Sequence, residues 1–406
     1  MVSSQTQKTE GSEAAPLLHT PLIALYLALF FFALHFALPL YVGSSLLAGY
    51  FNENLIGFLY AVPSLILLFL FARMPSVLRR FGVWRITLFL ALLEAGSVLG
   101  LAYSREALFL AIAFIANQAL VSLLFFNFDV FVESFSKDET TGAVRGTLLT
   151  VFNTAVLLGP FLAGLILTDG DYYRVYLASL VFLLPAFWIL LTRLDGFKEP
   201  AYTKTPYKEV IKEIFFAAHP RDAIRHALTA NLLMRFFFSW MVIYTPLYLH
   251  GTIGFSWSEI GIIFTVMLLP FVLFEAALGK IADARGNERM LIGAGFLITA
   301  FFTALLALLS APALAVWAAA LFGTRVGMSF VEVASESYFF KHITSADAGV
   351  LSVFRNANPV AYLVGPAAAS VLLFVFPLRA LFVILALVML YGAWDAYRAG
   401  RGRGAR

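Results

Sequence analysis

Twelve apolar runs, each about the twenty residues that a helix needs to cross a bilayer, dominate this 406-residue chain. They fall near 21–42, 55–74, 84–103, 107–132, 146–168, 172–192, 229–249, 259–278, 290–310, 313–335, 348–375 and 379–397. Hydrophobic residues make up 61% of the chain and charged residues only 13%, whereas about a quarter of a soluble domain is charged. The sequence therefore predicts an all-α membrane protein with twelve transmembrane helices.

One gap between the runs is much longer than the others and divides the chain into two halves. We expect a disordered tail at 1–20, a first six-helix bundle at 21–192, a cytoplasmic linker at 193–228, a second bundle at 229–398 and a basic tail at 399–406. Within the linker, apolar residues recur at helical spacing opposite charged ones, from Tyr207 to Phe215. This pattern predicts an amphipathic helix on the membrane surface.

The distribution of lysine and arginine predicts the orientation in the membrane. Of the 28 basic residues, three lie in predicted outer loops and three inside helices, and the other 22 fall on the side of the N-terminus. Because cytoplasmic loops carry the excess of basic residues, both termini are predicted to be cytoplasmic. We expect a multi-pass protein of the plasma membrane, a monomer surrounded by lipid. The basic residues form no single patch, which argues against a nucleic-acid partner.

The two halves repeat four short motifs in the same order, as is typical of transporters built from duplicated bundles. Pro39-Leu40-Tyr41 matches Pro246-Leu247-Tyr248, and Ile56-Gly57 matches Ile260-Gly261; further on, Val151-Phe152 matches Val353-Phe354, and Gly159-Pro160 matches Gly365-Pro366. Proline removes a backbone hydrogen bond, so helix bends are expected at Gly159-Pro160 and at Gly365-Pro366. Two pseudo-symmetric bundles are predicted.

A charged turn between the eighth and ninth runs carries a resemblance to a known family. The stretch from Gly279 to Arg289 resembles the loop signature of the major facilitator superfamily, Gly-x-x-x-Asp-(Arg/Lys)-x-Gly-(Arg/Lys)-(Arg/Lys). Gly279, Asp283 and Gly286 are in place, whereas Ala284 stands at the first basic position and Arg289 follows late. In the corresponding loop of the first half, Arg79 stands where the family has aspartate.

The fifth run resembles the antiporter signature of the same family, Gly-x(8)-Gly-x(3)-Gly-Pro-x(2)-Gly-Gly. Its positions are Gly146, Ala155, Gly159, Pro160, Ala163 and Gly164, so two glycines have become alanines. A stripe of small residues lets this helix lie close to a helix of the other half. Packing alone also explains such stripes, so the antiporter interpretation has a structural alternative.

The resemblance implies two bundles that rock about a central site and a secondary transporter moving a small organic solute. We expect proton-coupled efflux; the alternatives are uniport or proton symport of a sugar or metabolite, and a receptor or scaffold that no longer transports. The chain has no cysteine, no His-Glu-x-x-His or Gly-x-Ser-x-Gly motif and no phosphate-binding Gly-x(4)-Gly-Lys-(Ser/Thr) loop. We therefore expect no enzyme activity, no metal and no cofactor, and as the energy source a gradient of protons or another ion, or the gradient of the solute itself.

Polar and charged residues inside the apolar runs are the candidates for solute and proton binding, because each is costly in lipid. Arg325 lies in the middle of the tenth run with Glu332 and Glu336 on the same face, and we expect it to bind an anionic solute or to pair with Glu332. The other candidates are His35, Glu94, Asn117, Gln118, Asp129 and Arg235. Because histidine side chains can exchange protons near neutral pH, His35 is a candidate proton carrier; the alternative is a hydrogen-bonded residue of the pocket wall. For Glu94, in a helix that is peripheral in the resembled fold, a packing role competes with a proton site.

Charges near the predicted cytoplasmic helix ends are expected to form a gate. This set holds Arg80, Glu133, Gly279, Asp283, Arg285, Gly286, Arg289, Glu336 and Arg355. Charges at such positions can reach water or the interface, which favours ion pairs between helix ends over contact with the solute.

Overall fold

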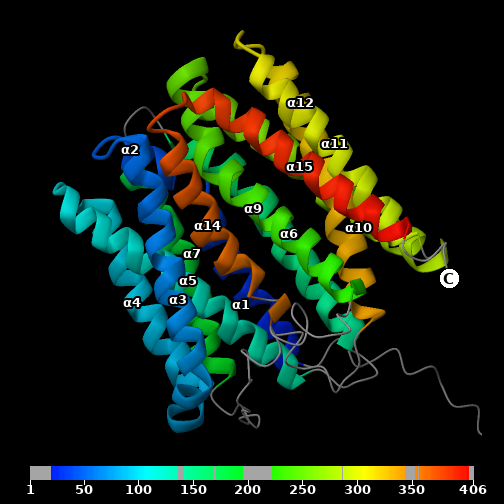
Figure 1. Ribbon diagram of the computed structural model, residues 1–406. Coiled ribbons are helices and arrows are strands. Elements are labelled where there is room, and N and C mark those ends of the chain that lie inside the picture. Colours follow the sequence, from blue (N-terminus) through cyan, green and yellow to red (C-terminus); the bar gives the residue numbers. More distant parts are fainter. Residues whose placement is uncertain are drawn as a thin grey trace, which may run out of the picture.

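The computed structural model describes residues 20–135, 141–167, 171–194, 222–285, 287–342, 353–354 and 356–401. Two groups of six long helices make up this part of the chain (Figure 1). The first group is α1 (Thr20–Ala37), α3 (Glu53–Phe81), α4 (Val83–Tyr103), α5 (Ala107–Phe135), α6 (Thr141–Ile166) and α7 (Tyr172–Arg193). The second is α9 (Asp222–Leu247), α10 (Trp257–Arg285), α11 (Glu288–Leu308), α12 (Leu314–Phe340), α14 (Ala357–Leu372) and α15 (Leu378–Arg401). The prediction of an all-α fold with twelve long helices is confirmed.

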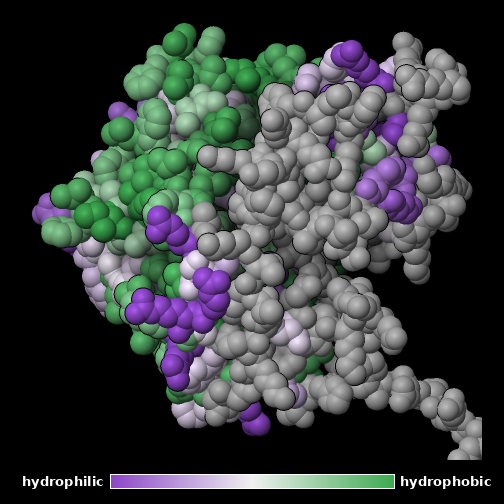
Figure 2. All heavy atoms as spheres, turned by 60° about the horizontal axis from the view of Figure 1, so that its bottom comes forward, coloured by the Kyte–Doolittle hydropathy of each residue, from purple (hydrophilic) through white to green (hydrophobic). Residues whose placement is uncertain are grey.

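Length and hydropathy mark most of these helices as membrane spans. Among the described residues, nine stretches are long and apolar enough to cross a bilayer, and Pro21–Ala37, Thr150–Ile166 and Ala357–Leu372 are shorter apolar helices. Large apolar side chains such as Leu108, Trp188 and Leu308 point outward, which suits a lipid environment. Figure 2 shows a broad hydrophobic flank beside hydrophilic side chains at the end of the molecule that this view brings forward.

Local sequence explains where several helices begin and break. The Asn52 side chain accepts a hydrogen bond of 3.0 Å from the Leu55 N–H and so caps the start of α3. Gly82, at φ 80°, joins α3 to α4, a conformation that glycine adopts without strain. The helix α9 begins at Asp222, ahead of the apolar run that starts near 229, and the predicted surface helix between Tyr207 and Phe215 lies outside the described residues.

The repeated Pro-Leu-Tyr motif ends its two helices differently. α1 stops at Ala37, and a turn through Pro39 leads into the short α2 (Gly43–Ala48). In the second half, Pro246 lies inside α9, which continues into a π-helical turn, η1 (Tyr248–Ile253). The first motif therefore places Tyr41 on a turn instead of a helix, and this frees its ring to reach the other bundle.

The two bundles touch through glycines at one end. α6 packs on α10 and α3 packs on α14. A Cβ atom at Gly261 would lie 2.7 Å from the Pro160 carbonyl oxygen, and one at Gly57 would lie 2.6 Å from the Pro366 carbonyl oxygen. Each contact therefore joins the Ile-Gly motif of one half to the Gly-Pro motif of the other, and the predicted close approach of helix five to the second half is confirmed.

We call this end of the molecule, which holds Tyr41, Gly57, Gly164, Gly261 and Pro366, the contact end. The opposite end, where α3, α5, α10 and α12 finish, is the far end. In Figure 1 the contact end lies at the top, near α2, and Figure 2 brings the far end forward.

Candidate functional site

Arg325 is a fully buried cation in the middle of α12. Only 1% of its surface is exposed, and its guanidinium carbon lies 5.2 Å and 5.1 Å from the ring centres of Phe237 and Phe238 on α9. Its Nε and Nη1 atoms have no hydrogen-bond partner among the described residues. Because a guanidinium keeps its charge and each unpaired buried donor is costly, this arrangement leaves binding capacity for an anion.

Aromatic hydroxyls complete the surroundings of Arg325. Tyr41 reaches it from the first bundle and Tyr362 from α14 of the second, and both interact electrostatically with the guanidinium. The Tyr41 ring also lies 4.6 Å from that of Phe264 on α10. Arg325 therefore lies where the two bundles meet, and its surroundings change whenever the bundles separate.

Glu332, one of the two expected partners of Arg325, interacts with its guanidinium electrostatically but forms no ion pair with it in this structure. Glu332 instead accepts a 3.2 Å hydrogen bond from Nη2 of Arg235 on α9, and the two side chains are 22% and 29% exposed. Seven residues of helix place Glu332 roughly 10 Å along the axis from Arg325, whereas α9 presents Arg235 at the same depth. The pair lies on the far-end side of Arg325, and its partial exposure indicates that water reaches these positions.

A second buried cluster lies entirely inside the first bundle and joins four of its helices. Nε2 of His35 on α1 lies 3.1 Å from Oε1 of Glu94 on α4, and the side chains are 1% and 0% exposed. Nδ1 of His35 lies 3.0 Å from the Ser179 carbonyl oxygen of α7. The carboxylate of Glu94 also accepts a hydrogen bond from Asn117 on α5, at 2.5 Å. The Ser97 hydroxyl lies 3.0 Å from the carboxylate and 2.8 Å from the Glu94 carbonyl oxygen, so two acceptors share its one hydrogen.

This cluster brings together three of the residues singled out in the sequence. The side chain of Glu94 points into the bundle, because α4 packs against both α5 and α7 and turns this face toward them. Gln118, next to Asn117, is half-buried, and Asp129 is exposed. Neither residue takes part in the hydrogen bonds of His35 and Glu94 given above.

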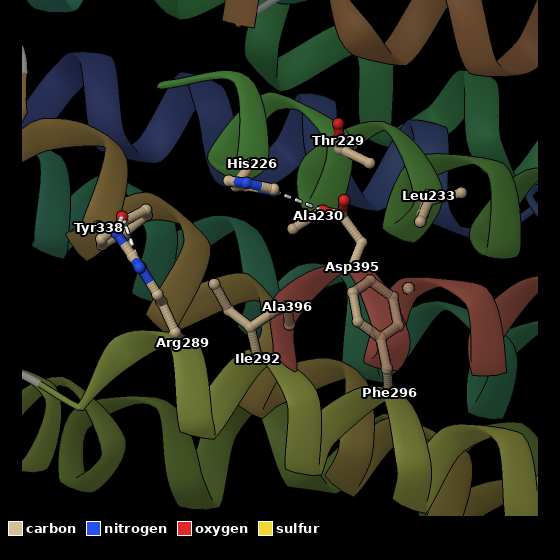
Figure 3. A pocket seen from close by; sticks show the side chains of 11 residues that line it. His226, Thr229, Ala230, Leu233, Arg289, Ile292, Phe296, Tyr338, Asp395 and Ala396 are labelled. Atoms are coloured by element: carbon tan, nitrogen blue, oxygen red, sulfur yellow. Dashed lines mark hydrogen bonds and ion pairs between the residues drawn. The ribbon is translucent and has the colours of Figure 1, made fainter. Parts of the chain in front are cut away.

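Polar contacts at the far end of the second bundle involve Arg289, one of the predicted gate residues, and three residues that the sequence did not single out. Figure 3 shows His226 of α9 directed at Asp395 of α15, with Nδ1 2.8 Å from Oδ2, and Arg289 of α11 beside Tyr338 of α12. The Arg289 Nε donates to the Tyr338 hydroxyl at 2.7 Å. These residues line a pocket together with apolar side chains, among them Leu233, Ile292 and Phe296.

The predicted gate is described only in part. Gly279 lies within α10, Arg80 lies over the ring of Phe81, and Glu336 lies on α12. The side chains of Glu133, Asp283 and Arg285 and the whole of Gly286 and Arg355 lie outside the described residues. The gate therefore stays a prediction. Pro160 and Pro366 lie inside α6 and α14, where their carbonyl groups form the two contacts between the bundles.

Comparison with known proteins agrees with this architecture. The family model described as Major Facilitator Superfamily matches residues 20–343, and no curated protein sequence matches. The crystal structure of the human organic anion transporter MFSD10 (TETRAN) is similar, with a TM-score of 0.64 and 16% identity over 93% of this chain and 100% of that one. The crystal structure of the peptide transporter POT in complex with sulfate has a TM-score of 0.72 and 13% identity, over 97% of this chain and 96% of that one. At these identities the likeness to solved structures shows the fold alone.

Proposed function

Because the chain belongs to the major facilitator superfamily, it is a secondary transporter of a solute, and we propose that it exports a small organic anion in exchange for protons. The solute site is built around Arg325, between the two bundles. Rocking of the bundles exposes this site to each side of the membrane in turn. Both termini face the cytoplasm, and the membrane is the plasma membrane.

The unpaired donors of Arg325 are the reason for proposing that the solute is an anion. Nε supplies one N–H and Nη1 two, so three of the five donors of the guanidinium lack an acceptor among the described residues. Carboxylate, sulfonate or phosphate oxygens match these donors in geometry and charge. The rings of Phe237 and Phe238 suit an apolar or aromatic body attached to the acid, so an amphiphilic organic anion satisfies both features.

The names of the similar structures point the same way. One is an organic anion transporter and the other is a peptide transporter that holds the anion sulfate. The exchange of the anion for protons is supported by the buried His35–Glu94 pair, which can carry a proton, and by the resemblance of α6 to the antiporter signature. Arg235 and Glu332 are the further candidates for contact with the solute.

A matched set of probes tests the charge of the solute. Benzoate, benzamide and benzylamine share one ring and differ in carrying a negative, no or a positive charge. A ligand that binds the folded protein raises its melting temperature, so we expect purified protein to be stabilised by benzoate and not by the other two. Arg325→Lys should lose this response, because lysine keeps the charge but not the planar donor set, whereas Arg174→Lys, at an exposed arginine, should keep it.

Stabilisation by benzylamine or benzamide equal to that by benzoate would contradict the proposal, as would a full benzoate response in Arg325→Lys. Transport of radiolabelled benzoate out of proteoliposomes then tests direction and coupling. An inward proton gradient should accelerate efflux, and dissipating the gradient should leave only exchange down the benzoate gradient.

A further inference from the structure

We infer that His35 and Glu94 together hold a single exchangeable proton inside the first bundle, and that loss of this proton is linked to opening of the contact end. The inference deepens the proposed function and rests on it, since it names the residues that couple protons to transport. Three observations support the inference: the hydrogen-bond geometry of the pair, its burial, and the path of α1 toward the other bundle.

Hydrogen-bond geometry fixes the proton count. The Ser179 carbonyl oxygen can only accept, so Nδ1 of His35, 3.0 Å away, must carry a hydrogen. In neutral histidine the other nitrogen, Nε2, is then a bare acceptor, and it faces Oε1 of Glu94 at 3.1 Å. One further proton must lie between these two atoms, on the carboxyl or on the imidazole.

The alternatives with no proton or two protons fit the site less well. Without the proton, the lone pairs of Nε2 and Oε1 face each other and the buried pair carries a negative charge. With two protons, His35 is an imidazolium, Glu94 is a neutral carboxylic acid, and the pair carries a positive charge. A single proton makes the pair neutral, the state that a site with 0–1% exposure favours.

Within the described part of the chain, no lysine or arginine takes part in the hydrogen bonds of this site. The neighbours of the pair are Asn117 on α5, Ser97 on α4, and the Ser179 carbonyl group on α7. The hydroxyl of Tyr176, also on α7, interacts electrostatically with Glu94. On α1, the ring of Phe32 stacks on His35 at 5.8 Å. Asn117 donates to the carboxylate and the Ser97 hydroxyl can turn to it, so they are placed to stabilise it once the proton has left.

The burial of the pair makes proton exchange depend on helix movement. Water reaches neither side chain in this state, so the proton can leave only when α1 moves relative to α4. Six residues beyond His35, the turn that follows α1 carries Tyr41 to Arg325 of the other bundle. Separation of the bundles at the contact end removes Tyr41 from Arg325 and so releases the turn that follows α1. Because His35 and Glu94 belong to one bundle, the proton leaves only if the released α1 then shifts relative to α4.

The release step then balances simply. The shared proton passes to water on the newly opened side, Glu94 remains as a carboxylate hydrogen-bonded to Asn117 and Ser97, and His35 remains neutral. The other carboxylates considered from the sequence suit this role less well: Asp129 is exposed, and protonation of Glu332 would break its pair with Arg235.

Distance measurements between the bundles test the inference without any solute. The chain has no cysteine, so Arg79→Cys on α3 and Met290→Cys on α11 introduce two unique spin labels at exposed far-end positions. We expect the populations of the two bundle separations, measured by double electron–electron resonance in nanodiscs, to change with pH with the slope of a single proton. Glu94→Gln, which keeps a neutral hydrogen-bonding group, should abolish this response, and Glu106→Gln, at an exposed glutamate of the same bundle, should retain it.

A milder variant guards against misfolding of Glu94→Gln. Ser97→Ala removes a hydroxyl that can turn from the Glu94 carbonyl oxygen to the carboxylate once the proton has left, and should move the midpoint of the pH response upward by roughly half a pH unit. A wild-type protein whose populations ignore pH, a Glu94→Gln variant with the wild-type response, or an unchanged midpoint in Ser97→Ala would each overturn the inference. Because none of these measurements uses benzoate, failure here leaves the anion site standing, and failure of benzoate binding leaves the proton pair standing.

Discussion

Replacing Gly261 with alanine should open the contact end without damaging either bundle. A Cβ atom at this position would lie 2.7 Å from the Pro160 carbonyl oxygen and 3.0 Å from the Cα of Gly164. Both atoms belong to the backbone of α6 in the other bundle, so no side-chain rotation relieves the clash. The helices must separate, and the cost falls on the contact between the bundles.

The size of the effect follows from the cost of an inserted methyl group. Overpacking a tight contact costs about 1–3 kcal/mol, which corresponds to a roughly 5- to 150-fold shift between two conformations. Alanine also favours helix over glycine by about 1 kcal/mol. Gly96→Ala is the matched control, because Gly96 lies inside α4 and an added Cβ would meet nothing within 4 Å.

Spin labels at the contact end measure this shift. Arg105→Cys and Ala311→Cys lie at exposed positions in the connections α4–α5 and α11–α12, one in each bundle. In Gly261→Ala we expect the longer separation to gain population, while Gly96→Ala keeps the distribution of the parent. An unchanged distribution in Gly261→Ala would refute the argument that these glycines hold the bundles together. A loss of melting temperature without any change in distance would refute it as well, since it would place the cost within a bundle.

Helix number and helix contacts were predictable from the sequence because they depend on local patterns. A run of about twenty apolar residues can satisfy its backbone in lipid only as a helix, which gave twelve helices. The stripe around Gly159 and Gly164 likewise predicted the approach of α6 to the other half, since only small residues allow it. The exact partner, Gly261, needed the structure.

The partners of the buried charges were not predictable, because they come from other helices. The spacing of Arg325 and Glu332 places both on one face of α12, but it does not predict which side chains of α9 lie opposite them. The structure shows that Arg235 of α9 forms the ion pair with Glu332. His35 and Glu94 are 59 residues apart and His226 and Asp395 are 169 apart. Each pair depends on the rotation of two helices about their axes, which packing of the whole bundle decides. Glu94 shows the same limit, since its helix was expected to be peripheral and yet its side chain points inward.

Three further predictions test contacts within the second bundle through the free energy of unfolding in detergent. Trp240→Phe should lower it by about 0.5–1.5 kcal/mol, because it removes the 2.6 Å hydrogen bond from the buried indole to the Gly365 carbonyl oxygen; a change no larger than that of an exposed Trp188→Phe control would contradict this. Tyr338→Phe should cost about 1–2 kcal/mol through loss of the Arg289 hydrogen bond, and an unchanged stability would show that the ring alone holds Arg289. The last concerns the pair of Arg235 and Glu332, for which single and double alanine variants form a cycle. Since both side chains are 20–30% exposed, their coupling should be about 1 kcal/mol, near the upper limit for pairs that water can screen. Arg325 and Glu332 form no ion pair and interact only at longer range, so their coupling should be weaker in the same assay. Stronger coupling of Glu332 to Arg325 than to Arg235 would show that Arg325 is its main partner and would leave Arg235 available for the solute.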